Sequence, residues 1–150
     1  MKHSEKAVEL FAQGYNCAQA LFAAFCDVTG MDEETALKIS SSFGAGMGRM
    51  REVCGAVSGM FMAAGLIWAS ADSSAEAKKN HYELIQKMAE KFKEKNNGTI
   101  ICRELLAGIK TDTKPVPDER NEQYYKVRPC VKFVVDASDI LDELLEECTK

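Results

Sequence analysis

Hydrophobic residues recur at intervals of three and four along almost the whole chain, with polar and charged residues between them. This spacing is typical of amphipathic helices, and no run shows the strict alternation of a half-buried β-strand. The periodicity predicts helices over about 4–13, 16–30, 32–39, 74–96, 99–106 and 129–145. The chain is therefore predicted to be all-α.

Residues 53–71 follow a different pattern, because these nineteen positions carry no charge. A stretch of this length reaches the span of a bilayer. Its glycines and serines fit better a buried helix with neighbours on several sides, since such a helix is apolar all round. We predict a single domain over residues 1–150, a bundle of about six to seven helices around this central helix, and no membrane association.

The second half of the chain contains a long amphipathic helix and a segment without periodicity. In the helix over 74–96, the predicted buried stripe consists of Tyr82, Ile85, Ala89 and Phe92, and Thr99 is the predicted cap of the next helix. Residues 108–128 contain two prolines, many charges and no periodicity, which predicts a long loop.

Composition and charge narrow the class of function. The chain has 46% hydrophobic and 28% charged residues, and its net charge is −4. A mildly acidic domain without a basic stripe does not favour nucleic acid as a partner. No apolar run of signal-peptide length follows the first residues, so a cytoplasmic location is expected. The acidic residues 142–147 offer a surface for a basic partner or for a second copy of the chain, which makes a homodimer one expectation.

The six cysteines are the unusual part of the composition. Four of them, Cys17, Cys54, Cys102 and Cys130, fall in the first turns of predicted helices, and we call these the helix-start cysteines. A helix N-terminus presents unpaired N–H groups and the positive end of the helix dipole. Thiols placed there are expected to have lowered pKa values and to act as nucleophiles or metal ligands.

Other candidate residues have a weaker case. Cys26 and Cys148 lie near helix ends, where a neutral, structural thiol is expected. His3 is expected in a frayed terminus and His81 on a solvated face, and neither is given a role. The gaps between the helix-start cysteines match no zinc finger, thioredoxin motif, ferredoxin run or covalent haem motif. From spacing alone, they could equally be core residues that start helices by coincidence.

The hexapeptide Cys54-Gly55-Ala56-Val57-Ser58-Gly59, with one cysteine upstream and two downstream, resembles the C_GCAxxG_C_C family of redox-active proteins. The resemblance runs from about residue 5 to residue 145 and selects the same four helix-start cysteines. It implies a helical domain with redox activity through these cysteines, related to a module of split-Soret cytochromes. The chain lacks the haem-binding signature of that group.

The leading hypothesis is that the helix-start cysteines converge and bind iron as an iron–sulfur cluster for electron transfer, since four thiolates are the usual ligands of such a cluster. The glycine-rich segment Gly44-Ala45-Gly46-Met47-Gly48-Arg49 is predicted to support the cofactor. Backbone N–H groups at Gly44, Gly46 and Gly48 can approach sulfur closely, and Arg49 and Arg51 add positive charge.

Two alternatives share the same residues. In one, pairs of these cysteines exchange disulfides without a metal; in the other, four thiolates hold a structural zinc ion. The expected partner is an electron-transfer protein or a small redox molecule. Gly55 and Gly59 have two compatible interpretations: they admit another cysteine beside Cys54, or they allow close helix packing.

Overall fold

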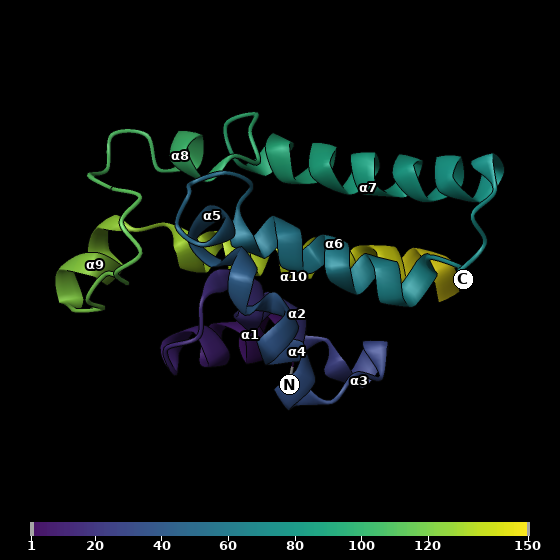
Figure 1. Cartoon of the computed structure of the whole chain (residues 1–150), viewed down its shortest axis with the longest axis horizontal. Coiled ribbons are helices and arrows are strands. Elements are labelled where there is room, and N and C mark those ends of the chain that lie inside the picture. Colours follow the sequence, from purple (N-terminus) through teal and green to yellow (C-terminus); the bar gives the residue numbers. More distant parts are fainter. Residues whose placement is uncertain (1, 150) are drawn as a thin grey trace.

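The computed structural model describes residues 2–149, which form helices joined by turns and by one long segment between α8 and α9 (Figure 1). The helices are α1 (His3–Ala12), α2 (Cys17–Ala24), α3 (Cys26–Thr29), α4 (Glu33–Ser40), α5 (Gly44–Met47), α6 (Gly55–Trp68), α7 (Ala75–Lys95), α8 (Cys102–Leu105), α9 (Glu122–Val127) and α10 (Cys130–Thr149), with a 3-10 turn, η1 (Ser41–Phe43). Within this range there is no β-strand. The predicted all-α class is confirmed.

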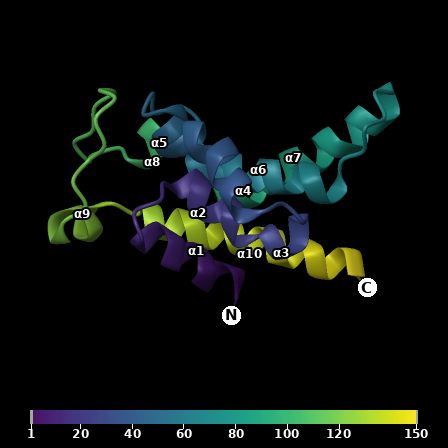
Figure 2. The ribbon, with the colours of Figure 1, turned by 60° about the horizontal axis from the view of Figure 1, so that its bottom comes forward.

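Helix α6 lies at the centre of the bundle. It packs against α2, α7 and α10, while α1 packs against α2 and α10, and α4 packs against α2. Helices α6 and α10 begin at the same end of the molecule, where α5, α8 and α9 also gather (left in Figure 1). Turning the molecule shows that the long segment and α9 project from this end (Figure 2). The predicted bundle around a central apolar helix is confirmed.

The central helix is shorter than the predicted range of 53–71. It begins at Gly55 because the residues before it are extended: Val53 forms an isolated antiparallel bridge with Ile101. It ends at Trp68, and Ala69 has an extended backbone. Among the described residues, no helix combines the length and the apolar character needed to cross a membrane.

The N-terminal helices follow the predicted caps more closely than the predicted lengths. Asn16 caps α2 through a reciprocal pair of hydrogen bonds: Gln19 N donates to Asn16 Oδ1 at 2.9 Å, and Asn16 N donates to Gln19 Oε1 at 3.0 Å. The prediction of one helix from 16 to 30 is wrong, because the backbone leaves the helical conformation at Phe25 and a separate helix, α3, follows. Gly30 ends α3 in the left-handed conformation, as its position suggested.

The structure corrects three details of the C-terminal half. Tyr82 is 58% exposed, and the buried residues of α7 are Met88 and Phe92, because the first half of α7 extends beyond the bundle (Figure 2). Thr99 does not cap α8: the cap position is Ile101, whose N–H donates to Thr99 Oγ1. The predicted loop over 108–128 contains α9.

Substitution of two glycines in α6 tests how closely the helices of this bundle pack. A Cβ at Gly59 would lie 2.9 Å from the backbone oxygen of Ala18 in α2, whereas a Cβ at Gly65 would meet nothing within 4 Å. We expect Gly59→Ala to lower the free energy of unfolding by about 1–3 kcal/mol through overpacking. Gly65→Ala in the same helix should raise it by up to about 1 kcal/mol.

Urea unfolding followed by circular dichroism measures both variants. Equal effects of the two substitutions would show that α2 and α6 do not approach each other as closely as described.

Candidate functional site

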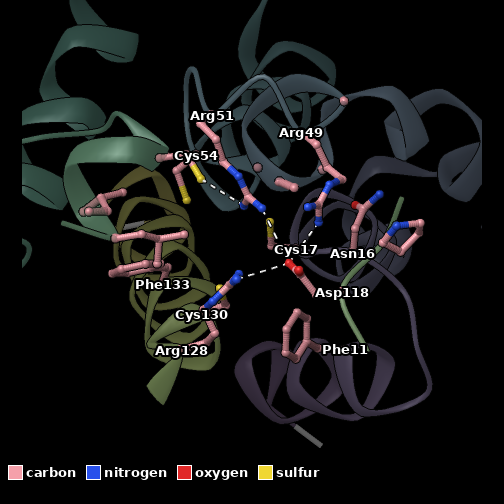
Figure 3. Close-up of a pocket in the computed structure, with 18 of the residues that line it drawn as sticks. Phe11, Asn16, Cys17, Arg49, Arg51, Cys54, Asp118, Arg128, Cys130 and Phe133 are labelled. Atoms are coloured by element: carbon pink, nitrogen blue, oxygen red, sulfur yellow. Dashed lines mark hydrogen bonds and ion pairs between the residues drawn. The ribbon is translucent and has the colours of Figure 1, made fainter. Parts of the chain in front are cut away.

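The four helix-start cysteines all lie at the end of the bundle where their helices begin. Cys17, Cys102 and Cys130 are the first residues of α2, α8 and α10, and Cys54 occupies the cap position just before α6. All four line one cavity of about 330 Å³. Figure 3 labels three of them, Cys17, Cys54 and Cys130. The structure thus brings together the residues that the sequence singled out, and their role as ligands stays a prediction.

A short backbone pairing holds Cys54 and Cys102 next to each other. Cys54 N donates to Ile100 O at 2.8 Å, and Cys102 N donates to Glu52 O at 2.6 Å. These two bonds flank the bridge between Val53 and Ile101. Two segments almost fifty residues apart in the sequence are therefore fixed at the cavity by the main chain, before any side-chain interaction is considered.

The glycine of the Cys54-Gly55 pair makes room for another cysteine. A Cβ at Gly55 would lie 2.5 Å from Cys17 Sγ, so the Cys17 sulfur sits where a side chain would otherwise be. Both interpretations of the motif glycines therefore apply, each at its own position: Gly55 admits a second thiol beside Cys54, and Gly59 allows α2 to pack closely against α6.

The glycine-rich segment forms a left-handed turn. Residues 45–49 all have positive φ, from 54° to 73°, and this is the conformation of the short element α5. For the residues other than glycine, the left-handed region costs about 1–2 kcal/mol each. Strain of this kind persists only where the surroundings enforce it, and it gathers at functional sites.

The turn approaches the site through its glycines. A Cβ at Gly46 would lie 2.7 Å from Cys102 Cβ, and a Cβ at Gly44 would overlap the side chain of Asn16, which caps α2. Gly44 and Gly48 line the cavity. Among the described residues, no backbone N–H of residues 44–48 is hydrogen-bonded to a cysteine sulfur, so N–H donation from this turn stays a prediction.

The structure corrects the expected pKa values of the thiols. Burial raises the pKa of Cys54 well above its ordinary value, and repulsion from a Cys17 thiolate raises it further. Burial also raises the pKa of Cys102, and it raises the pKa of Cys130 to about 12 with help from Cys17 and Cys102. At Cys54 the backbone N–H groups of Ala56 and Val57 oppose burial but do not outweigh it. Without a bound metal ion, these three thiols are neutral at neutral pH.

Arginines surround the thiols, and we call Arg49, Arg51 and Arg128 the arginine cluster. Their side chains are 10%, 5% and 8% exposed. Arg51 Nη1 donates to Cys102 Sγ at 3.8 Å, which opposes the rise in the pKa of that thiol. Arg51 Nη2 is buried and has no hydrogen-bond partner among the described residues. The expected positive charge at Arg49 and Arg51 is therefore present beside the cysteines (Figure 3).

Sequence reasoning missed the residues that the 108–128 segment adds to the cavity. Asp118, Arg120, Tyr124 and Arg128 line it, together with two prolines. One signal was available, because Arg128 stands two residues before Cys130. Asp118 and Arg120 gave no such signal, since only the path of the segment across the site brings them there.

The remaining candidates lie outside the cavity. Cys26 is half-buried, and burial with the nearby Glu33 raises its pKa, which agrees with the expected neutral thiol. His3 is not frayed: its ring nitrogens lie 2.7 Å from Asp142 Oδ1 and 2.9 Å from Asp27, and the ring stacks on Phe25. Lys91 and Lys87 of α7 pair with Glu143 and Glu147, so part of the acidic end of α10 is neutralised within the chain.

The described residues contain no ready-made site for a single metal ion. Among residues 2–149, no three His, Cys, Asp or Glu side chains are grouped so that they could hold one. The helix-start cysteines share a cavity, but their side chains are not grouped around one ion.

Comparison with known proteins places the chain in a family. No curated protein and no solved structure matches it. Residues 15–144 match the model of a family described as "Putative redox-active protein (C_GCAxxG_C_C)". This match includes all four helix-start cysteines and most of the chain, and it shows that the protein belongs to the C_GCAxxG_C_C family of redox-active proteins.

Proposed function

We propose that the four helix-start cysteines hold an iron–sulfur cluster and that the protein transfers single electrons through it. The observation that carries this proposal is the meeting of four thiols, from four separate helix starts, at one cavity. Four thiolates are the usual ligands of a cluster with two or four irons. Membership of a redox-active family supports the same chemistry.

The size of the cavity favours a cluster over a single zinc ion. Four thiolates around one zinc, each at about 2.3 Å, would have to lie within about 4 Å of one another. The described residues contain no group of even three potential ligands arranged in this way. A cavity of about 330 Å³ between the cysteines suits a cofactor of several atoms better.

The charges around the cavity support an anionic cofactor. A cluster with four thiolates and bridging sulfides is negative, and the buried arginine cluster offers positive charge beside it. Arg51 Nη2 is a buried donor without a hydrogen-bond partner among the described residues, and sulfur atoms of a cluster would supply an acceptor. When bound, the cluster would accept and release one electron.

The metal-free alternative has less support. Thiol–disulfide exchange begins with attack by a thiolate. Burial raises the pKa of Cys54, Cys102 and Cys130, so few thiolates form at neutral pH without a bound metal ion. A metal removes this obstacle, because thiols that coordinate a metal lose their protons.

The partner is proposed from the chemistry alone. An electron-transfer protein or a small redox molecule would donate or receive the electron. A reducing compartment such as the cytoplasm fits six free thiols.

Substitution of each cysteine tests the proposal. We expect the protein, purified without oxygen, to contain iron and acid-labile sulfide and to absorb visible light. Ser substitution of any helix-start cysteine should remove most of the iron and sulfide, because the cluster needs all four thiolates as ligands. Elemental analysis, sulfide assay and absorption spectra measure the loss.

Cys26→Ala and Cys148→Ala are the matched controls, since both thiols lie outside the cavity. They should retain iron and sulfide at the level of the unchanged protein. Stoichiometric zinc without sulfide would contradict the cluster and indicate a structural zinc site. Free thiols that cycle reversibly with disulfides, without metal, would favour the metal-free alternative.

Arg51 should influence the redox potential. Its positive charge and its hydrogen bond to Cys102 Sγ stabilise the more negative, reduced state of a cluster. We expect Arg51→Gln to lower the midpoint potential by about 60 mV, the equivalent of one charge-assisted hydrogen bond of about 1.4 kcal/mol. Spectroscopic redox titration measures this shift.

The control is Arg103→Gln, which removes a nearby arginine whose side chain is 55% exposed and pairs with Glu52. Its potential should stay within about 15 mV of the original, because solvent screens its charge. Equal shifts in both variants would show that Arg51 has no direct contact with the cluster.

A further inference from the structure

One carboxylate oxygen at the cavity is shared by three guanidinium groups. Asp118 Oδ2 lies 2.9 Å from Arg49 Nη1, 3.2 Å from Arg128 Nη2 and 3.5 Å from Arg51 Nη2. Figure 3 shows the three side chains of the arginine cluster converging on this group, with the sulfur atoms around them. A single side chain thus occupies the meeting point of the buried positive charges.

The positive charge of the arginines at this point exceeds the negative charge of the carboxylates. Arg120 also lines the cavity, where it binds the carbonyl oxygens of Phe11 and Tyr15 and lies over the Phe11 ring. Among the described residues, the carboxylates of Asp112 and Asp118 pair with the three guanidiniums of the arginine cluster, whereas Arg120 binds carbonyl oxygens. Buried guanidiniums without anions are costly, so this position requires an anion in every folded state.

The anion now present belongs to a largely exposed segment. Asp118 lies in the stretch between α8 and α9, has a side chain 32% exposed, and follows residues 112–117, which are all exposed. Hydrogen bonds tie this stretch to the arginine cluster itself: Arg49 Nε donates to Lys114 O, and Arg51 Nε donates to Asp112 O. Before Asp118, the stretch is therefore tied to the site by the same groups that hold the Asp118 carboxylate, and after it by the bonds of Arg120 to Phe11 and Tyr15.

We propose that the Asp118 position is an exchangeable anion subsite, which a small carboxylate or oxyanion ligand fills when Asp118 leaves. The ligand replaces a charge already present, so the charge at the site does not grow when it binds. Its anionic group would contact the arginine cluster, and the rest of the molecule would lie in the cavity beside the thiols. The whole cavity of about 330 Å³, which the anion would share with any cofactor on the thiols, is at the lower end of small-molecule pockets, so the ligand is small.

A second observation points to a ligand at this place. Arg51 Nη2 lies in the buried part of the cavity and lacks a hydrogen bond among the described residues, although it is 3.5 Å from Asp118 Oδ2. The tethered carboxylate therefore leaves one donor unused. A free anion with more acceptor oxygens, or with freedom to move closer, would satisfy Arg51 as well as Arg49 and Arg128. Arg51 Nη2 is also the donor that the proposed cluster would use, so a cluster sulfur and the anion are alternative acceptors for it.

Acetate is the probe for this subsite. Calorimetric titration with sodium acetate, at constant ionic strength kept with sodium chloride, is carried out on the full-length protein and on Asp118→Ala. We expect saturable binding to both, with a dissociation constant for the unchanged protein at least about tenfold higher, because its own carboxylate competes for the position. Adding Arg128→Gln to Asp118→Ala should weaken acetate binding.

Glu52→Ala is the matched control, because it removes a carboxylate from Arg103, an arginine outside the cavity. Acetate should bind this variant as it binds the unchanged protein. If Asp118→Ala does not fold, Asp118→Asn keeps the shape of the side chain without its charge and should show the same tighter binding.

Each remaining outcome overturns the inference. Binding to the Asp118 variant but not to the unchanged protein would mean that Asp118 is a fixed structural partner. Absence of saturable binding to both, or equal binding with and without Arg128→Gln, would mean that no anion subsite exists there. None of these results bears on iron and sulfide content, so the cluster proposal is tested separately.

Discussion

Cys17 and Cys102 reach the cavity because the chain opposite each of them has no side chain. Gly55 leaves room for the Cys17 sulfur, and Gly46 leaves room for the Cβ of Cys102. The left-handed turn over residues 45–49 and the bridge between Val53 and Ile101 hold these contacts in place. The rest of the bundle depends on this constraint, since the helix starts can meet only where their backbones approach so closely.

Two opposing electrostatic effects then decide the state of the thiols. Helix starts favour thiolates, and burial disfavours them. In this protein burial prevails, because it raises the pKa of Cys54 and Cys130 far beyond what a few N–H groups can offset. The buried arginine cluster shows that the site is nevertheless built for negative charge. A cofactor that brings its own cations, and so keeps the thiols deprotonated, reconciles these two features.

Much of the fold could be predicted from the sequence, because helical periodicity and caps such as Asn16 and Gly30 are local signals. The selection of the helix-start cysteines also followed from local position. Other features depend on distant contacts: His3 is fixed by Asp27 and Asp142, and Asp118 reaches the cavity through the path of a segment without periodicity. The direction of the thiol pKa shifts could not be predicted either, since burial at the site becomes visible only in three dimensions.

The central claim is that the helix-start cysteines surround an iron–sulfur cluster. The most direct measurement is anomalous X-ray scattering at the iron absorption edge, from crystals of protein purified without oxygen. The account predicts iron peaks inside the cavity, bonded to the sulfur atoms of Cys17, Cys54, Cys102 and Cys130. A peak at the zinc edge in the same place, iron bound elsewhere, or a disulfide between two of these cysteines in place of metal would contradict it.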